Sequence, residues 1–388
     1  MAFLKLLAGE IRALAKQPMT VVILFVGPIF LTLLFGGVYV HNYLEDIPIA
    51  VLDEDNSATS RTIVRQFAAN ERFYVKYYAD SREQLQNLID SRRVYMGLYI
   101  PPDFSKDVNS LKSSQVLVLV DGTNVVIGNN SYAEAANIIQ TLAAGVQMKI
   151  LEANGVLPQT AQNMALAFNF NDRILYDPRL TYMNYLMLGF VAVFLQQVMV
   201  SSMGLSVVDD GPRLAGGNTF LGLVAKVLSC GLFAVPALFV SIGISHQLFR
   251  IPIRGNLWLI LLMCVIFIFA VSCPAVIIAS VLKDKLKVYQ LSFMLSLPTF
   301  VSSGYVWPLQ QTPHALTLLI KIFWPLIYFH RPFADVIFKG VPFDAVKGSI
   351  VGMAVYVLGW FPVAVWALKR SFGVPGTRER MEKGLGLP

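Results

Sequence analysis

Apolar residues along this chain fall into long uncharged runs, except in one stretch of about 140 residues where they form shorter, alternating groups. A helix needs about 20 apolar residues to cross the roughly 30 Å hydrocarbon core of a bilayer. Runs of about that length predict six transmembrane helices. They lie at residues 18–39, 182–208, 219–248, 257–282, 288–306 and 348–368.

The segment before the first run has the spacing of an amphipathic helix. Within residues 1–17, apolar side chains share one side, and Lys5, Glu10, Arg12 and Lys16 lie on the other. We expect this helix to lie along the inner membrane surface. The run at 18–39 is too long for the apolar part of a signal peptide, and no small-residue cleavage site follows it. It is therefore predicted to be a retained span.

Residues 41–180 have the pattern of a folded domain instead of a membrane segment. Strand patterns at 47–52, 73–78, 94–100 and 115–120 alternate with helical ones, including 82–93, which opens with a capping box at Ser81 and Gln84. A longer helix is expected at 130–153, with a linker over 154–179. Strands alternating with helices predict an α/β fold.

Between the fifth and sixth runs, residues 307–347 contain a shorter apolar segment. Residues 315–329 are about 15 in number and are broken by Pro325. A segment of this length does not cross a bilayer, so it is expected to form a re-entrant or interfacial hairpin.

Composition and charge support this picture. The chain is 55% hydrophobic and 14% charged, with a mean hydropathy of +0.59, which indicates an integral membrane protein. Residues 41–180 hold 12 Lys and Arg against 16 Asp and Glu, whereas the rest holds 19 against 8. With the N-terminus inside, inner segments carry thirteen Lys and Arg and outer short loops carry six. This bias predicts cytoplasmic termini and an extracytoplasmic 41–180 domain. The basic residues flank apolar runs, which argues against a nucleic-acid partner.

Motifs for chemistry on this chain are weak. The segment 211–219 has the glycine spacing of a phosphate-binding loop but lacks its lysine, so we interpret it as a cytoplasmic loop that engages a partner or simply connects spans. Asp53, Glu54 and Asp55 could ligate a hard cation, although a solvated turn is the favoured interpretation. The four histidines are too scattered for a metal site, and Cys230, Cys264 and Cys273 fit as small core residues. No metal, cofactor or catalytic residue is therefore predicted here.

Charged residues are nearly absent from the predicted spans. Lys226 lies only about two turns into the span at 219–248. Carriers driven by ion gradients depend on intramembrane charges. Any transport is therefore expected to be energised from outside this chain.

Several segments together resemble the ABC-2 type transporter permeases, in the six-span subgroup with a large external domain after the first span. The resemblance covers nearly the whole chain. Its segments are Ile-Pro-Ile-Ala-Val-Leu-Asp at 47–53, Ile-Pro-Pro-Asp-Phe-Ser at 100–105, Val-Leu-Val-Asp-Gly-Thr-Asn at 118–124, Ser-Gly-Tyr-Val-Trp-Pro at 303–308, Trp-Pro-Leu at 324–326 and Phe-Lys-Gly at 338–340. After the second span the family usually carries an acidic segment with Arg-Gly-Thr, and residues 208–219 depart from it.

The resemblance implies a half-transporter that dimerises and is driven by a separate cytoplasmic ATPase, which would hold the ATP and Mg. The second permease would be a copy of this chain or a different one, and membrane lipid would surround both. The residues expected to couple to the ATPase are Glu10, Arg12, Lys16, Asp209, Asp210, Gly211, Pro212, Arg213, Lys283, Lys285 and Lys287. Candidates for the translocation path are Phe190, Phe194, Gln197, Ser303, Gly304, Tyr305, Trp307 and Pro308.

The predicted fold is an α-helical polytopic membrane protein with six transmembrane helices and an inserted extracytoplasmic α/β domain. Its parts are the interfacial helix (1–17), the first span (18–40), the α/β domain (41–180), spans two to six with the hairpin (181–370), and a basic cytoplasmic tail (371–388). The predicted function is that of the permease of an exporter for drug-like, lipidic or other amphiphilic substrates in the inner or plasma membrane. The alternative is a membrane protein without transport activity whose external domain binds a partner or surface ligand.

Overall fold

The computed structural model describes residues 2–40, 44–110, 112–165, 173, 175–177 and 181–373. The chain divides into two compact units, one of residues 1–40 with 175–388 and one of residues 41–174. The two are described separately below. Beyond residue 373, the expected basic tail lies outside the described residues. Parts of the expected linker also lie outside them.

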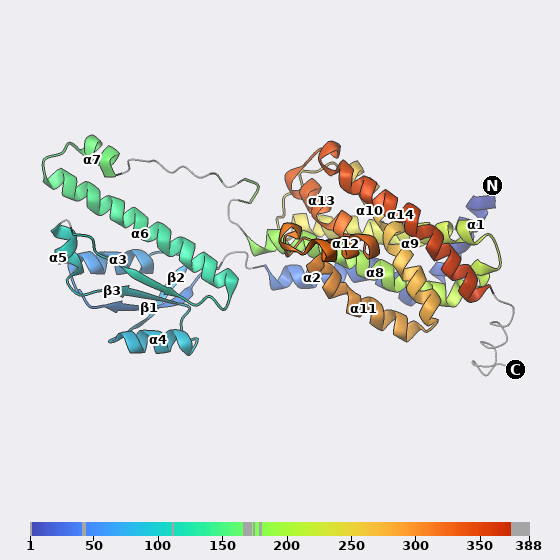
Figure 1. Cartoon of the computed structure of the whole chain (residues 1–388), viewed down its shortest axis with the longest axis horizontal. Coiled ribbons are helices and arrows are strands. Elements are labelled where there is room, and N and C mark those ends of the chain that lie inside the picture. Colours follow the sequence, from blue (N-terminus) through green and yellow to red (C-terminus); the bar gives the residue numbers. More distant parts are fainter. Residues whose placement is uncertain are drawn as a thin grey trace. The chain divides into compact units, whose positions relative to one another are not determined.

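The unit of residues 41–174 is built on a four-stranded sheet of order β2-β1-β3-β4 (Figure 1). Its strands are β1 (Ile47–Asp53), β2 (Phe73–Tyr78), β3 (Met96–Ile100) and β4 (Leu117–Val120). Strand β1 pairs in parallel with β2 and β3, with Ile49 opposite Met96, and β4 pairs antiparallel with β3. The predicted alternation of strands and helices is present in this unit.

Alternate residues of the strands face two different sets of helices. Ile49 and Val51 pack with α3 (Ala58–Ala68) and α6 (Val125–Ala153), whereas Ala50 and Leu52 pack with α4 (Arg82–Asp90). The sheet is therefore covered on both faces. Helix α5 (Phe104–Asn109) follows β3, and α7 (Pro158–Ala165) occupies part of the stretch that was expected to be a plain linker.

Two boundaries in this unit differ from the prediction for local reasons. Helix α6 begins at Val125 instead of residue 130, because the Asn124 side chain accepts hydrogen bonds from the N–H groups of Val126 and Ile127. Helix α4 ends at Asp90, and Arg92 takes a positive φ of 55°. The three acidic residues after β1 form a turn, in which Asp53 accepts from the N–H groups of Asp55 and Asn56.

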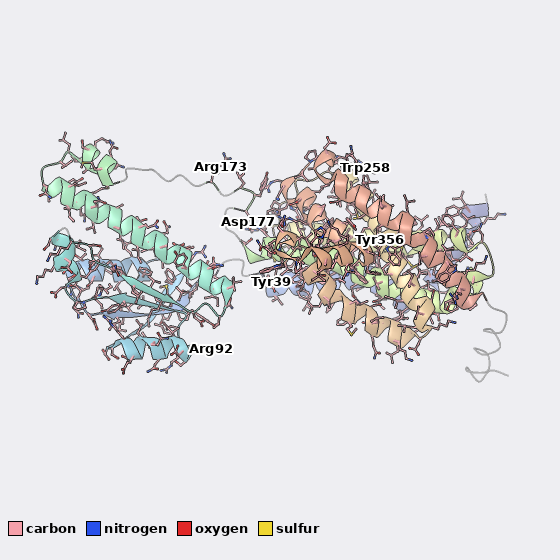
Figure 2. The ribbon with its side chains drawn as sticks, viewed as in Figure 1. Tyr39, Arg92, Arg173, Asp177, Trp258 and Tyr356 are labelled. Atoms are coloured by element: carbon pink, nitrogen blue, oxygen red, sulfur yellow. The ribbon has the colours of Figure 1, made fainter. Side chains whose placement is uncertain are left out.

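The second unit is a bundle of helices (Figure 1). Their bounds are α1 (Ala2–Ala15), α2 (Pro18–Val38), α8 (Tyr182–Ala215), α9 (Thr219–Gln247), α10 (Leu257–Leu282), α11 (Lys285–Ser302), α12 (His314–Phe323), α13 (Leu326–Lys339) and α14 (Phe343–Phe372). Large aromatic side chains of this unit differ in exposure. Tyr356 is buried among the helices, whereas Trp258 lies at the edge of the bundle and is 78% exposed (Figure 2).

Within the described part of the chain, five helices are long and apolar enough to cross a membrane, namely α2, Met183–Ala215 of α8, α9, α10 and α14. The predicted fifth span, at 288–306, does not meet this measure. Helix α11 has 18 residues, includes Lys285 and Lys287, and ends at Ser302, just before Gly304 at a φ of +84°. A sixth crossing therefore stays a prediction.

The interruption expected at Pro325 is present between α12 and α13. The last carbonyl groups of α12 lack hydrogen-bond donors within their own helix. Side chains of α14 supply these donors. Trp360 Nε1 donates to Ile322 O at 2.7 Å, and the Tyr356 hydroxyl donates to Phe323 O at 3.0 Å. These two bonds hold the broken helix against α14.

Candidate functional site

A cluster of four charged side chains joins α1 to the ends of two long helices. Glu10 of α1 is 0% exposed, and its Oε1 lies 2.6 Å from Arg213 Nη1 of α8. Lys226 of α9 is also 0% exposed; its Nζ contacts Asp210 of α8 and lies 3.5 Å from Glu10 Oε2. Arg213 lies 3.6 Å from Asp210 as well. We call Glu10, Asp210, Arg213 and Lys226 the ion cluster.

The ion cluster corrects two predictions. Glu10 was placed on the polar side of the first helix, but it is buried, and two cations, Arg213 and Lys226, compensate its charge. The segment 211–219 was expected to be a loop, yet α8 continues through Gly211 and Pro212 to Ala215. The chain turns at Gly216 and Gly217 instead. Gly211 is needed for packing, because a Cβ at this position would lie 2.8 Å from the Phe372 ring.

The other residues predicted to couple to the ATPase lie near the same helix ends. Lys285 Nζ lies 2.6 Å from Asp209 Oδ1, which links α11 to α8. Lys283 Nζ donates to Ser371 O at 2.8 Å, which links the turn after α10 to the end of α14. The connection between α10 and α11 is short, because Asp284 caps α11 and places Lys285 and Lys287 in its first turn. Arg12 and Lys16 are exposed.

Some of the path candidates form one aromatic group. Phe190 and Phe194 of α8 stack with ring centroids 6.0 Å apart, and both pack against Phe35 of α2. Phe190 also packs against Phe300 of α11 at 5.5 Å. Gln197 donates to Ser201 of its own helix, and Trp307 is 57% exposed.

A buried histidine that the sequence did not single out holds the segment 303–305. His330 of α13 is 0% exposed, and its Nδ1 lies 2.7 Å from Ser303 Oγ. Its Nε2 donates to Gly189 O of α8 at 3.0 Å, and its ring stacks on Tyr305 at 4.2 Å. Gly304, with its positive φ, packs against Leu309. A lone histidine among apolar residues gives no sequence signal for this role.

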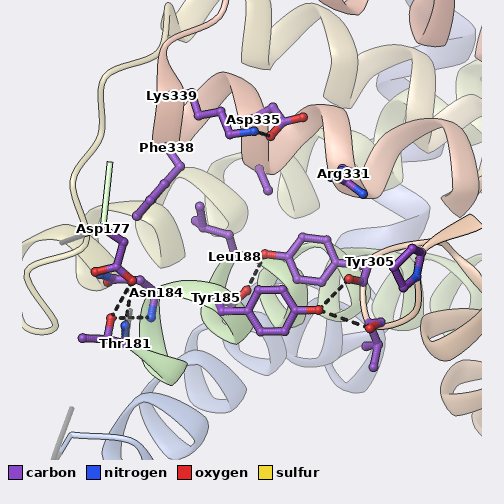
Figure 3. A pocket seen from close by; sticks show the side chains of 13 residues that line it. Asp177, Thr181, Asn184, Tyr185, Leu188, Tyr305, Arg331, Asp335, Phe338 and Lys339 are labelled. Carbon is purple, nitrogen blue, oxygen red and sulfur yellow. Dashed lines mark hydrogen bonds and ion pairs between the residues drawn. The ribbon is translucent and has the colours of Figure 1, made fainter. Parts of the chain in front are cut away.

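A pocket of about 570 Å³ opens beside Tyr305, between the start of α8, the segment after α11, and α13 (Figure 3). Tyr305 and Pro308 are the path candidates that line it. Its other lining residues are Asp177, Thr181, Asn184, Tyr185, Leu188, Val306, Arg331, Ala334, Asp335, Phe338 and Lys339.

The comparison with known families identifies the chain's class. Residues 18–366 match the model of the family described as ABC-2 family transporter protein. The chain belongs to this family. It is therefore the membrane subunit of an ABC transporter and a multi-pass membrane protein, and the family implies a partnership with an ABC ATPase.

Curated relatives agree with this assignment. The chain is 24% identical over 355 residues to the probable multidrug ABC transporter permease YbhR of Escherichia coli K12, covering 89% of this chain and 92% of the relative. It is 20% identical over 343 residues to the inner membrane transport permease YhhJ of the same strain, covering 84% and 86%. A match of 32% over 111 residues to ABC transporter G family member 20 of Dictyostelium discoideum covers 28% of this chain and 15% of that protein.

In this ABC-2 permease, one glutamine connects the interior of the bundle to the broken helix. Gln196 of α8 is 1% exposed; its Nε2 donates to Thr299 Oγ1 of α11 at 3.0 Å, and its Oε1 accepts from Trp324 Nε1 at 2.8 Å. Sequence reasoning had selected the neighbouring Gln197 instead. Two adjacent glutamines in one apolar run look alike in a sequence, and only the helical rotation separates them.

Proposed function

We propose that this chain is the permease of an ABC exporter and pairs with a second permease, either identical or different. A separate cytoplasmic ATPase binds and hydrolyses ATP with Mg, and this chain holds no cofactor. Both termini and the ion cluster face the cytoplasm of a cell with an inner or plasma membrane, and the 41–180 domain faces outward. The exported substrates are drug-like, lipidic or otherwise amphiphilic.

The observation that carries the proposal is the ion cluster. Buried ions in contact are costly to separate, because each loses its compensating charge. The cluster therefore favours concerted movement of α1 with the ends of α8 and α9. The Asp209–Lys285 pair connects this group to α11.

Helix α8 offers a route from this end to the pocket. It has 34 residues and is thus about 51 Å long. Asp210 and Arg213 lie near its C-terminal end, whereas Tyr185 and Leu188 line the pocket near its N-terminal end. Because the helix is continuous, a displacement of its C-terminal end by an ATPase would be transmitted to its N-terminal end, beside the pocket. The names of the two E. coli relatives, a multidrug permease and a transport permease, agree with export of drug-like molecules.

The test is reconstitution of the permease with its ATPase in lipid vesicles, with measurement of ATP hydrolysis and substrate export. The double variant Asp209→Asn/Lys285→Gln removes an exposed ion pair near the ion cluster. We expect reduced stimulation of the ATPase and reduced export, with an unchanged melting temperature, because exposed pairs contribute about 0–1 kcal/mol to folding.

A matched control is Asp103→Asn/Lys106→Gln, an exposed pair 3.9 Å apart in the α/β unit. It should leave ATP hydrolysis and export unchanged. Equal activity of both double variants would show that the ATPase does not act through the region of Asp209 and Lys285. A permease that neither stimulates any ATPase nor moves substrate would favour the partner-binding alternative.

A further inference from the structure

We infer that the pocket beside Tyr305 is a binding site for an amphiphilic anion, in which Arg331 binds the anionic group and the aromatic wall holds the apolar body. The inference identifies a substrate class within the proposed function, but the binding itself needs neither an ATPase nor transport.

Both carboxylates that line the pocket already have donors. Asp177 accepts from the N–H of Thr181 at 2.8 Å, from its hydroxyl at 3.2 Å, and from Asn184 Nδ2 at 3.1 Å. Asp335 Oδ1 pairs with Lys339 Nζ at 2.7 Å. A cationic ligand would have to compete with these partners, so the pocket is poorly suited to cations.

Arg331 differs from the other charged lining residues. Asp335 lies one turn farther along α13 but pairs with Lys339, and Figure 3 draws no interaction between Arg331 and the residues around it. Among the described residues, no ion pair or side-chain hydrogen bond is found for Arg331. A guanidinium offers five N–H donors in a planar fork that matches carboxylate, sulfonate and phosphate groups.

The surroundings add further positive charge. Arg254 lies behind the pocket wall, where its Nη1 donates to Phe338 O at 2.8 Å. Among the lining residues Arg331 and Lys339 balance Asp177 and Asp335, and Arg254 adds one positive charge behind the wall. The field favours an anion over a neutral or cationic ligand.

Most of the rest of the wall is apolar. The hydroxyls of Tyr185 and Tyr305 donate to main-chain carbonyl groups, so these residues present their rings. Leu188, Val306 and Phe338 extend the apolar surface. A volume of about 570 Å³ is in the range of sites for drug-sized ligands, which are about 300–1,000 Å³. The complementary ligand is a compact apolar or aromatic body with one anionic group.

The experiment uses a matched pair of fluorescent probes, dansylglycine, which is anionic, and dansylethylenediamine, which is cationic. Both are titrated against the full chain in nanodiscs of zwitterionic lipid, with empty nanodiscs subtracted. We expect saturable binding of dansylglycine at least about tenfold tighter than that of dansylethylenediamine, because only the anion can accept a charge-assisted hydrogen bond from Arg331.

Variants assign the site. Arg331→Gln should weaken dansylglycine binding about tenfold or more, and Arg331→Glu should shift the preference to dansylethylenediamine. Asp335→Asn should leave dansylglycine binding unchanged or tighten it, since it removes a negative charge and frees Lys339. Melting temperatures of all variants check folding.

Three results would overturn the inference. They are equal affinity for the two probes, dansylglycine binding that is insensitive to both Arg331 variants, and weaker dansylglycine binding in Asp335→Asn. Failure of the ATPase assay with retained selective binding would count against the proposed coupling alone.

Discussion

Tyr185 and Tyr305 hold each other by reciprocal hydrogen bonds. The Tyr185 hydroxyl donates to Tyr305 O at 2.7 Å, the Tyr305 hydroxyl donates to Tyr185 O, and the rings stack with centroids 5.4 Å apart. The pair fixes the segment after α11 to the start of α8, and it forms one wall of the pocket (Figure 3). The two hydrogen bonds contribute differently to stability. The Tyr185 carbonyl lies within α8 and also accepts a hydrogen bond from the helix backbone.

We predict that Tyr185→Phe destabilises the protein more than Tyr305→Phe does. Tyr185→Phe removes the hydroxyl that donates to the Tyr305 carbonyl, at a cost of about 0.5–1.5 kcal/mol, whereas the Tyr185 carbonyl keeps its helical bond in Tyr305→Phe. Thermal unfolding in detergent is the measurement. Tyr289→Phe, at a tyrosine that is 42% exposed on α11, is the control and should be neutral. An equal loss in both tyrosine variants would contradict the asymmetry.

Gly189 is predicted to be intolerant of a side chain. A Cβ there would lie 2.6 Å from Tyr305 Cε1 and 3.1 Å from His330 Nε2, so Gly189→Ala must displace the ring stack. Gly243→Ala in α9 is the matched control, because a Cβ at Gly243 meets nothing within 4 Å and alanine favours helices. We expect a lower melting temperature for Gly189→Ala and an unchanged or higher one for Gly243→Ala. The reverse order would show that this packing is loose.

Gln196 and Gln197 are predicted to behave differently despite being neighbours. Gln196→Leu leaves the Trp324 indole N–H without its acceptor, which should cost about 1–3 kcal/mol. Gln197→Leu breaks only the bond to Ser201 and should be milder. Unfolding midpoints of the two variants test this, and equal midpoints would mean that the link from α8 to the broken helix contributes little.

Local patterns were enough to predict much of the fold. Strand alternation and capping residues gave the elements of the α/β unit, because the signals lie within a few residues of each other. The motifs at 47–53 and 100–105 also meet in space, because Asp53 lies opposite Ile100 in the paired strands β1 and β3, and Ser105 donates to Asp55 just after β1. Their part in the family resemblance thus has a structural explanation, which is that they meet at the carboxyl ends of the two central strands.

The ion cluster could not be predicted, because its members lie up to 216 positions apart and their pairing depends on helix packing. The sequence suggested that Asp210 and Arg213 lie in an exposed loop, where substitution usually costs under about 0.5 kcal/mol. They instead end a continuous helix beside the fully buried Lys226. This is why Asp209 and Lys285, whose side chains are 39% and 55% exposed and which lie outside the ion cluster, are better positions for testing coupling.

The orientation in the membrane is a further prediction, based on the bias of lysine and arginine residues. All three cysteines are buried and free, so a background without them can carry single reporters. Ser110→Cys and Asn129→Cys, at exposed positions of the α/β unit, should react with a membrane-impermeant maleimide in spheroplasts. Gly217→Cys, exposed between α8 and α9, should react only after lysis. The opposite pattern would invert the topology.

The ion cluster leads to the last prediction, on Lys226. Lys226→Met leaves the buried Glu10 and the partly buried Asp210 with Arg213 as their shared cation, and breaking a buried ion pair from one side costs about 3–5 kcal/mol. We expect a loss near the lower end of this range, because Arg213 still neutralises part of the charge. Glu10→Gln should cost less, since Lys226 keeps Asp210. If the cluster acts as a unit, the double variant Glu10→Gln/Lys226→Met should lose less than the sum of the two single variants.

The measurement for this cycle is unfolding of the purified protein in mixed micelles, with Lys285→Gln as the control. Lys285 also pairs with an aspartate of α8, but its side chain is 55% exposed, so its loss should cost well under 1 kcal/mol. The comparison separates the effect of burial from the effect of losing a positive charge. Each of the two lysines makes a close ion pair with an aspartate of α8. If Lys226→Met proves as mild as Lys285→Gln, or if the losses simply add, the four residues do not act as a unit, and α1 is held to the bundle by its apolar face alone.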